Sequence, residues 1–137
     1  MIYSADDDLI NVITSFIRKA RRKLYVCSYL LSLPFFMAEL VNKKRAGIDV
    51  KVLLANDSSN IPAVNFLRSN KVDVRLVYQT RGRLHAKFII ADNKAMITTC
   101  NYTHDGLNNN KELAVILSRH DVRKLEEIFH QWWRENH

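Results

Sequence analysis

Residues 84–92 read Leu-His-Ala-Lys-Phe-Ile-Ile-Ala-Asp and carry the most informative pattern in the chain. His85 and Lys87 are two positions apart, so on an extended strand both side chains project from the same face. The apolar run 88–91 is typical of a buried strand, and Asp92-Asn93-Lys94 is typical of the tight turn that ends one. The stretch therefore predicts a strand with an imidazole and an ammonium group near its start.

The residues that follow predict two more strands that meet the first at one edge of a sheet. Residues 95–100 are expected to form a returning strand that delivers Asn101 close to the start of the first strand. Glu112 then opens another apolar run, 113–117. An imidazole, an ammonium, an amide and a carboxylate would thus share one edge, and together these groups suit binding a phosphate and attacking it.

The same residues resemble the signature of the phospholipase D superfamily. The pattern His85-x-Lys87-(x)4-Asp92 is followed by Asn101-Tyr102-Thr103 and Asn110-x-Glu112, and the spacing from Asn101 to Glu112 is similar to that of the family's small bacterial endonucleases. The family usually carries Gly-Ser before its asparagine, where this chain has Thr98-Thr99. The Thr99 hydroxyl can replace serine as a hydrogen-bond partner, whereas Thr98 is bulkier and stiffer than glycine.

This resemblance implies a mechanism that needs neither a metal nor a cofactor. His85 would attack phosphorus and form a covalent phosphohistidine. Glu112 would hydrogen-bond the other ring nitrogen of His85, while Lys87 and Asn101 would hold the non-bridging oxygens. Asp92 would be a structural turn residue rather than a direct participant.

The resemblance also implies a homodimer. A second histidine must protonate the leaving oxygen and then activate water. The chain has one copy of the motif and no internal repeat, whereas two-motif members of the family place their copies about a pseudo-twofold axis. We therefore expect two chains to share one site, with a C2 axis between their copies of His85 and Lys87.

Charge indicates a polyanionic partner. Twenty-one Lys and Arg against fourteen Asp and Glu give a net charge of +7 and a pI near 9.6. Such a balance favours nucleic acid or an acidic membrane surface. Arg81 and Arg83 immediately precede His85, so we expect them to contact phosphates that flank the scissile one.

Three functions fit these residues. The leading hypothesis is a nuclease that cleaves DNA or RNA. The alternatives are a hydrolase of phospholipids such as cardiolipin, and a non-catalytic nucleic-acid-binding scaffold with the same fold. Intact His85, Lys87, Asn101 and Glu112 argue against the scaffold.

Strand and helix patterns alternate along the chain, so residues 1–137 are expected to form one α/β domain. The resemblance implies a phospholipase D-like sandwich, a mixed β-sheet flanked by helices on both faces. Ser4 or Asp6 is expected to cap the first helix, and the last helix to bury a stripe from Val122 to Trp132. Strands are expected over residues 23–31, 49–54, 72–78, 88–91, 95–100 and 113–117, with helices between the first and second and between the second and third of them.

Cysteine usage and hydropathy predict the cellular compartment and the absence of membrane insertion. Cys27 and Cys100 form no C-x-x-C pair and have no partners at metal-ligand spacing, so we expect reduced core thiols in a cytoplasmic protein. The acidic run 6–8 interrupts the N-terminus before any apolar stretch suits a signal peptide. The most apolar window, 25–37, is too short to span a bilayer, so no stable membrane insertion is expected.

Overall fold

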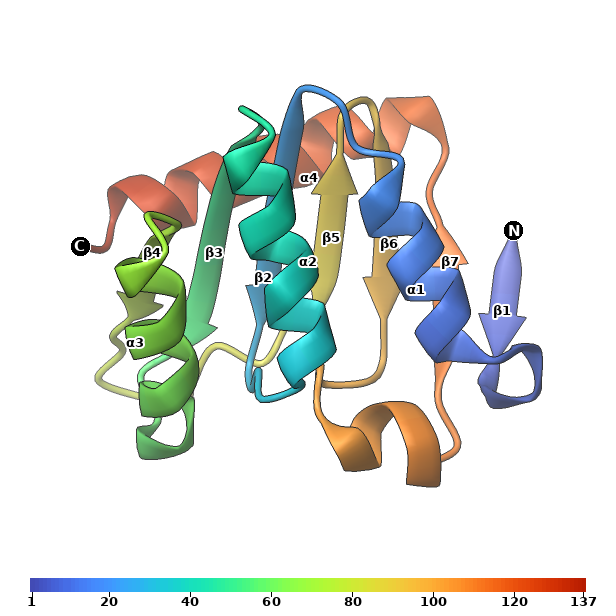
Figure 1. The fold of residues 1–137 in the computed structure, drawn as a ribbon, viewed down its shortest axis with the longest axis horizontal. Helices are drawn as coiled ribbons and strands as arrows, with labels where there is room; N and C mark the ends of the chain where they lie inside the picture. The colour runs from blue at the N-terminus through green and yellow to red at the C-terminus, as the bar shows by residue number, and fades with distance from the viewer.

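The computed structural model describes all 137 residues and contains one seven-stranded mixed sheet. The strands lie in the order β1-β7-β6-β5-β2-β3-β4 (Figure 1). Their bounds are β1 (Ile2–Ser4), β2 (Lys23–Ser28), β3 (Asp49–Ala55), β4 (Asp73–Val77), β5 (Phe88–Ala91), β6 (Lys94–Thr98) and β7 (Leu113–Ile116). The expected α/β architecture with a mixed sheet is confirmed.

The sheet has a parallel half and an antiparallel half. Strands β2, β3 and β4 pair in parallel, because α2 (Pro34–Arg45) and α3 (Ile61–Ser69) return the chain over the sheet between them. Strands β5, β6 and β7 form an antiparallel meander, and β1 pairs with β7 at the edge. The antiparallel pairing of β2 with β5 joins the two halves.

Helices cover both faces of the sheet. Helices α1 (Leu9–Arg18), α2 and α3 lie on one face, and α4 (Arg119–Arg134) crosses the other (Figure 1). The central strands are therefore buried on both sides, which explains their almost continuous apolar runs. Along β2, Leu24 and Val26 pack in the cluster under α1, α2 and α3, whereas Tyr25 and Cys27 pack in the cluster under α4.

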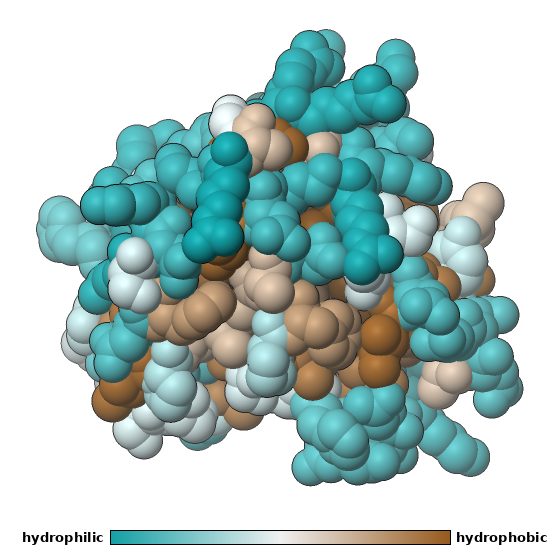
Figure 2. All heavy atoms as spheres, in the orientation of Figure 1, coloured by the Kyte–Doolittle hydropathy of each residue, from teal (hydrophilic) through white to brown (hydrophobic).

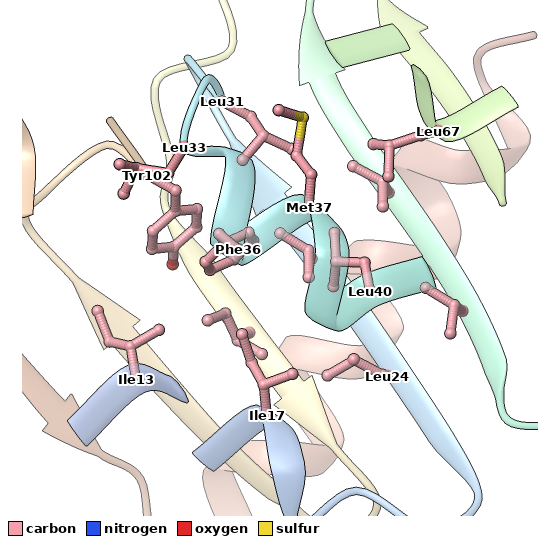
Figure 3. Close-up of a cluster of buried hydrophobic side chains, with 14 of the residues drawn as sticks. Ile13, Ile17, Leu24, Leu31, Leu33, Phe36, Met37, Leu40, Leu67 and Tyr102 are labelled. Carbon is pink, nitrogen blue, oxygen red and sulfur yellow. The ribbon is translucent and has the colours of Figure 1, made fainter. Parts of the chain in front are cut away.

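The larger core cluster lies under the three-helix face. Figure 3 shows Phe36 of α2 beside Tyr102, with Ile13 and Ile17 of α1 close by. The rings of Phe36 and Tyr102 stack with their centroids 4.5 Å apart. The outer surface of this face carries hydrophilic residues along its upper part, more hydrophobic ones across its middle, and hydrophilic ones again in the lobe at the bottom (Figure 2).

Two details at the helices differ from the sequence-based expectations. Ser4 caps a short 3-10 turn, η1 (Ala5–Asp7), and Asp8 caps α1 by accepting from the Asn11 N–H. In α4 the buried residues are Val122, Phe129 and Trp133, while Trp132 is only half-buried. Helical spacing predicted Trp132 as the buried tryptophan, and that prediction is wrong because the way α4 crosses the sheet turns Trp133 toward it.

The predicted strand bounds were close, although four strands are shorter than expected. β2 ends at Ser28 and β6 at Thr98, and β4 (Asp73–Val77) and β7 (Leu113–Ile116) are also shortened. A three-residue strand, β1, was not predicted. Among the helices, none combines the length and the apolar character that crossing a bilayer would require.

Candidate active site

Three strand ends meet at one edge of the sheet, the lower edge in Figure 1. The antiparallel registers Phe88↔Ile97 and Thr98↔Ala114 place the start of β5, the end of β6 and the start of β7 side by side. The segment 85–87 leads into β5, residues 99–101 follow β6, and Glu112 immediately precedes β7. The sequence predicted that these segments meet at one edge, and the sheet topology shows that they do.

His85 and Lys87 are in direct contact at this edge. Lys87 Nζ lies 3.1 Å from Nδ1 and 3.5 Å from Nε2 of His85. Both residues precede β5 rather than belonging to it, although the Thr98 N–H donates to the Lys87 carbonyl at 3.0 Å and so extends the ladder. His85 is exposed and Lys87 half-buried. Burial lowers the pKa of Lys87 below its usual value, against the opposing influence of the Glu112 charge.

Glu112 is held by Thr99 and Asn110, not by His85. The Thr99 hydroxyl donates to Glu112 Oε1 at 2.6 Å, and Asn110 Nδ2 donates to Oε2 at 3.3 Å. Thr99 Oγ1 in turn accepts from the Leu113 N–H at 2.9 Å. The expected hydrogen bond from Glu112 to His85 is therefore absent within one chain. The reason is topological: β6 lies between β5 and β7, so Thr99 meets the carboxylate first.

Asn101 is anchored to the end of β2. Its Oδ1 accepts from the Leu30 N–H at 3.3 Å, and no hydrogen bond within the chain uses its Nδ2. The neighbouring Tyr102 is fully buried and bridges to Leu31. The amide N–H₂ of Asn101 is therefore free to donate to an oxygen at this edge.

Thr98, which stands where the family usually has glycine, is built into the core. It is 4% exposed, its hydroxyl donates to the Cys100 carbonyl at 3.1 Å, and it lies 3.0 Å from the Tyr102 hydroxyl. A glycine does pack closely nearby, at Gly106 of η3 (Asp105–Asn109), where a Cβ would clash with the Asn101 carbonyl oxygen. The loop that carries Asn101 is thus shaped by a different small residue.

Asp92 lies at the other end of β5, away from His85. It takes a left-handed conformation with φ 57°, and its carboxylate accepts from the N–H groups of Arg21, Arg22 and Lys23 at 2.8–3.2 Å. Partial burial pushes the pKa of Asp92 upward, but these backbone donors outweigh it and hold the pKa below its usual value. The geometry is that of a turn that fastens the loop between α1 and β2.

The loop between β4 and β5 brings Arg81 and Arg83 to the same edge, and both are exposed. Arg83 Nη1 donates to the Tyr29 hydroxyl at 3.0 Å, and its guanidinium lies 5.5 Å from the centre of the Tyr29 ring. The Tyr29 and His85 rings are 5.2 Å apart. Sequence reasoning missed Tyr29; its position directly after β2, at the edge where β3 also ends, is the signal that was available.

The other reactive groups are either buried in the core next to this edge or lie elsewhere. Cys27 and Cys100 are free, buried thiols, as expected, and burial raises the pKa of Cys100 to about 11. His130 pairs with Glu126 on α4. No three His, Cys, Asp or Glu side chains are grouped so that they could hold a metal ion.

Comparison with known proteins gives matches over most of the chain. The family model described as "Cardiolipin synthase, PLD-like domain" matches residues 13–133. Over 120 residues the chain is 31% identical to the mitochondrial cardiolipin hydrolase of Canis lupus familiaris, a match that covers 85% of this chain and 47% of that protein. It is 30% identical over 120 residues to phospholipase D of Rickettsia prowazekii, covering 85% and 57% of the two chains.

A solved structure with the same fold is Nuc from Salmonella typhimurium, described as a phospholipase D family member. The TM-score is 0.90 at 21% identity, and the superposition covers 100% of this chain and 95% of Nuc. The chain spans about half the length of the curated relatives it matches.

Proposed function

The chain belongs to the phospholipase D superfamily, and on that premise we propose that it is a metal-independent phosphodiesterase that cleaves nucleic acid through a phosphohistidine at His85. The observation that carries the proposal is the contact between Lys87 Nζ and the ring of an exposed His85, with Asn101 at the same edge of the sheet. An accessible imidazole beside an ammonium group suits attack on a phosphodiester, whose negative charge must be neutralised.

The reaction proceeds in two displacements. A ring nitrogen of neutral His85 attacks phosphorus, a nitrogen–phosphorus bond forms, and the bond to the leaving oxygen breaks as a second histidine protonates that oxygen. Water then attacks the phosphohistidine and gives its proton to the second histidine, and the nitrogen–phosphorus bond breaks. Lys87 and the free Asn101 amide stabilise the charge on the non-bridging oxygens in both steps.

The second histidine comes from a second copy of this chain. Within one chain, His130 pairs with Glu126 on α4, and His104 lies against Asp105 and Asn109 on η3. An exposed His85 on an open edge leaves room for a partner's His85 across a C2 axis. Sedimentation of the purified chain should then give a dimer.

Thr99 and Glu112 position the strands that carry the reacting groups. The Thr99 hydroxyl links β6 to β7 through its bonds to Glu112 and to the Leu113 N–H. Burial lowers the pKa of Lys87, and the charge of the Glu112 carboxylate partly offsets this and so favours the charged form of the lysine. Glu112 thereby supports the cation that binds the phosphate.

Nucleic acid is the proposed substrate because of charge around the site. The net charge is +7, and Arg81 and Arg83 are both exposed beside His85. Cations in this position suit the phosphates on either side of the scissile one.

Cleavage of labelled single- and double-stranded DNA and RNA in excess EDTA tests the proposal. His85→Ala should abolish cleavage, while His120→Ala, an exposed histidine in the first turn of α4, should leave it unchanged. Acid-labile radioactive phosphate on the wild-type chain would mark the phosphohistidine. A verified dimer that cleaves no nucleic acid would refute the nuclease, and binding without cleavage would point to a scaffold.

A phospholipid hydrolase is the second candidate, and the curated relatives favour it. The two described above carry the names cardiolipin hydrolase and phospholipase D. Release of phosphatidic acid from cardiolipin vesicles, lost in His85→Ala and without nuclease activity in the same preparation, would establish the lipid substrate instead.

A further inference from the structure

Two cavities adjoin each other beside His85, and neither has a role in the chemistry described above. The first, about 310 Å³, is lined by Tyr29, Asp57, Tyr78 and Arg83, among others. The second, about 340 Å³, is lined by Tyr78, Arg83, His85 and the half-buried Trp132 of α4. Both volumes are at the lower end of the range for small-ligand sites. Tyr78 and Arg83 are among the residues that line both cavities, so the two cavities adjoin at these side chains.

Tyr78 is an aromatic side chain without a partner. It follows β4 directly, it is 60% exposed, and no other ring or cation stacks on it. Its backbone N–H donates to Asn136 Oδ1 at 3.0 Å, so the residue is held in place while its ring stays free. An exposed, unstacked ring that lines a cavity is a platform for another flat group.

Arg83 is held in position by Tyr29. Besides the hydrogen bond to the Tyr29 hydroxyl, the guanidinium lies over the ring of that residue. The Tyr29 hydroxyl is itself 3.5 Å from Asp57 Oδ2. The wall opposite Tyr78 is thus a stacked and hydrogen-bonded pair rather than two mobile side chains.

Asp57 gives the first cavity a negative charge. The Ser59 hydroxyl and N–H donate to Asp57 Oδ1 at 2.6 and 2.9 Å. These bonds hold the pKa of Asp57 below its usual value, so the group is a carboxylate at neutral pH. A carboxylate repels phosphate but accepts from N–H groups, and an acyl chain would leave it desolvated without a partner.

We propose that this pair of cavities binds one unpaired nucleobase of the substrate, stacked on Tyr78, with its N–H edge directed toward Asp57. The inference rests on the proposed nuclease function and makes it more specific. The base must leave its duplex partner to enter the pocket. Because Tyr78 and His85 line the same cavity, the bound base belongs to the nucleotide next to the scissile phosphate.

An abasic scan tests the proposal. Full-length protein carrying His85→Ala, so that it binds without cleaving, is titrated with a single-stranded 12-mer and with copies that each lack one base. Tyr78→Leu is compared with Tyr78→Phe, which keeps the ring, and with Phe66→Leu, which removes an exposed ring from α3.

One abasic position should weaken binding about 5- to 150-fold, the range expected for one base stacked on an aromatic residue. Tyr78→Leu should weaken binding of the intact 12-mer by a similar factor and erase the penalty at that position. The Tyr78→Phe and Phe66→Leu variants should retain the wild-type penalty. A folded Tyr78→Leu variant that shows the same penalty profile would overturn the inference.

The nucleobase pocket and the nuclease activity can be refuted separately. If the chain cleaves oligonucleotides in EDTA but Tyr78→Leu matches the wild type on every one of them, the nucleobase pocket is wrong and the nuclease stands. If the chain neither binds nor cleaves any oligonucleotide, both are wrong.

Discussion

Replacing Asp92 with alanine should destabilise the protein without touching its chemistry. The carboxylate accepts from three backbone N–H groups, those of Arg21, Arg22 and Lys23. Each such bond contributes about 0.5–1.5 kcal/mol net, and alanine at φ 57° costs about 1 kcal/mol more. Water at this half-buried loop replaces part of the loss, so we expect a decrease of about 2–3 kcal/mol in the free energy of unfolding.

Thermal and urea denaturation measure this loss. For a domain of this size it corresponds to a decrease in Tm of roughly 8–12 °C. Asp92→Asn is the matched control, because asparagine tolerates the left-handed conformation and keeps one acceptor, and it should lose only about 1 kcal/mol. Cleavage per folded molecule should be unchanged in both variants.

The effect should depend on pH in one direction. The folded pKa of Asp92 lies below its usual value, so the stabilisation is fully present above about pH 4 and is lost as the pH falls through the folded pKa. The difference between wild type and Asp92→Ala should therefore shrink in acid. Equal stability of the two at pH 7, or a folded Asp92→Ala variant that no longer cleaves, would refute this reasoning.

Three further changes act at the candidate site. Thr99→Val removes the hydroxyl that donates to Glu112, so urea denaturation should show a loss of about 1 kcal/mol with slower cleavage, and Thr99→Ser should restore both; a Val variant with wild-type rates would contradict this. Gly106→Ala puts a Cβ against the Asn101 carbonyl oxygen, so we expect about 1–3 kcal/mol of destabilisation in a thermal melt and a fall in kcat. Unchanged values would show that the loop can shift to make room for the methyl group. Burial lowers the pKa of Lys87, so as the pH rises the cleavage rate should begin to fall at a lower pH than the one at which a free lysine loses its proton. An active Lys87→Arg variant should lack this alkaline decline. A pH–rate profile with the same decline in both proteins would assign the decline to another group.

The sequence was sufficient for features that depend on short-range pattern. Three features could be predicted because strand period and turn chemistry are local: the apolar run of β5, the turn at Asp92 and the start of β7 after Glu112. Antiparallel pairing of β5 with β6 then follows from the tight turn between them, and the apolar run after Glu112 indicated the third strand, which is why the shared edge of His85, Asn101 and Glu112 could be predicted.

Contacts between elements remote in sequence could not be read in the same way. The partner of Glu112 depends on β6 lying between β5 and β7, and the resemblance to the family alone suggested His85 instead. The cluster of Tyr29, Asp57 and Arg83 joins loops that follow β2, β3 and β4, so it exists only once the parallel half of the sheet is assembled. No periodicity marks such residues.

The pairing of β1 with β7 also has a consequence for the order of events during synthesis. Ile2 pairs with Val115, which is synthesised far later. Two helices and two strands also separate β2 from its antiparallel partner β5 in the sequence. Ribosomes add roughly 5–20 residues per second, so β2, β3 and β4 emerge seconds before the meander that carries His85, Asn101 and Glu112. A growing chain thus holds no assembled phosphate site, and a message truncated before codon 112 would encode a product without Glu112. The proposed nuclease would therefore reach its working form only once β7 and the Glu112 that precedes it had been synthesised.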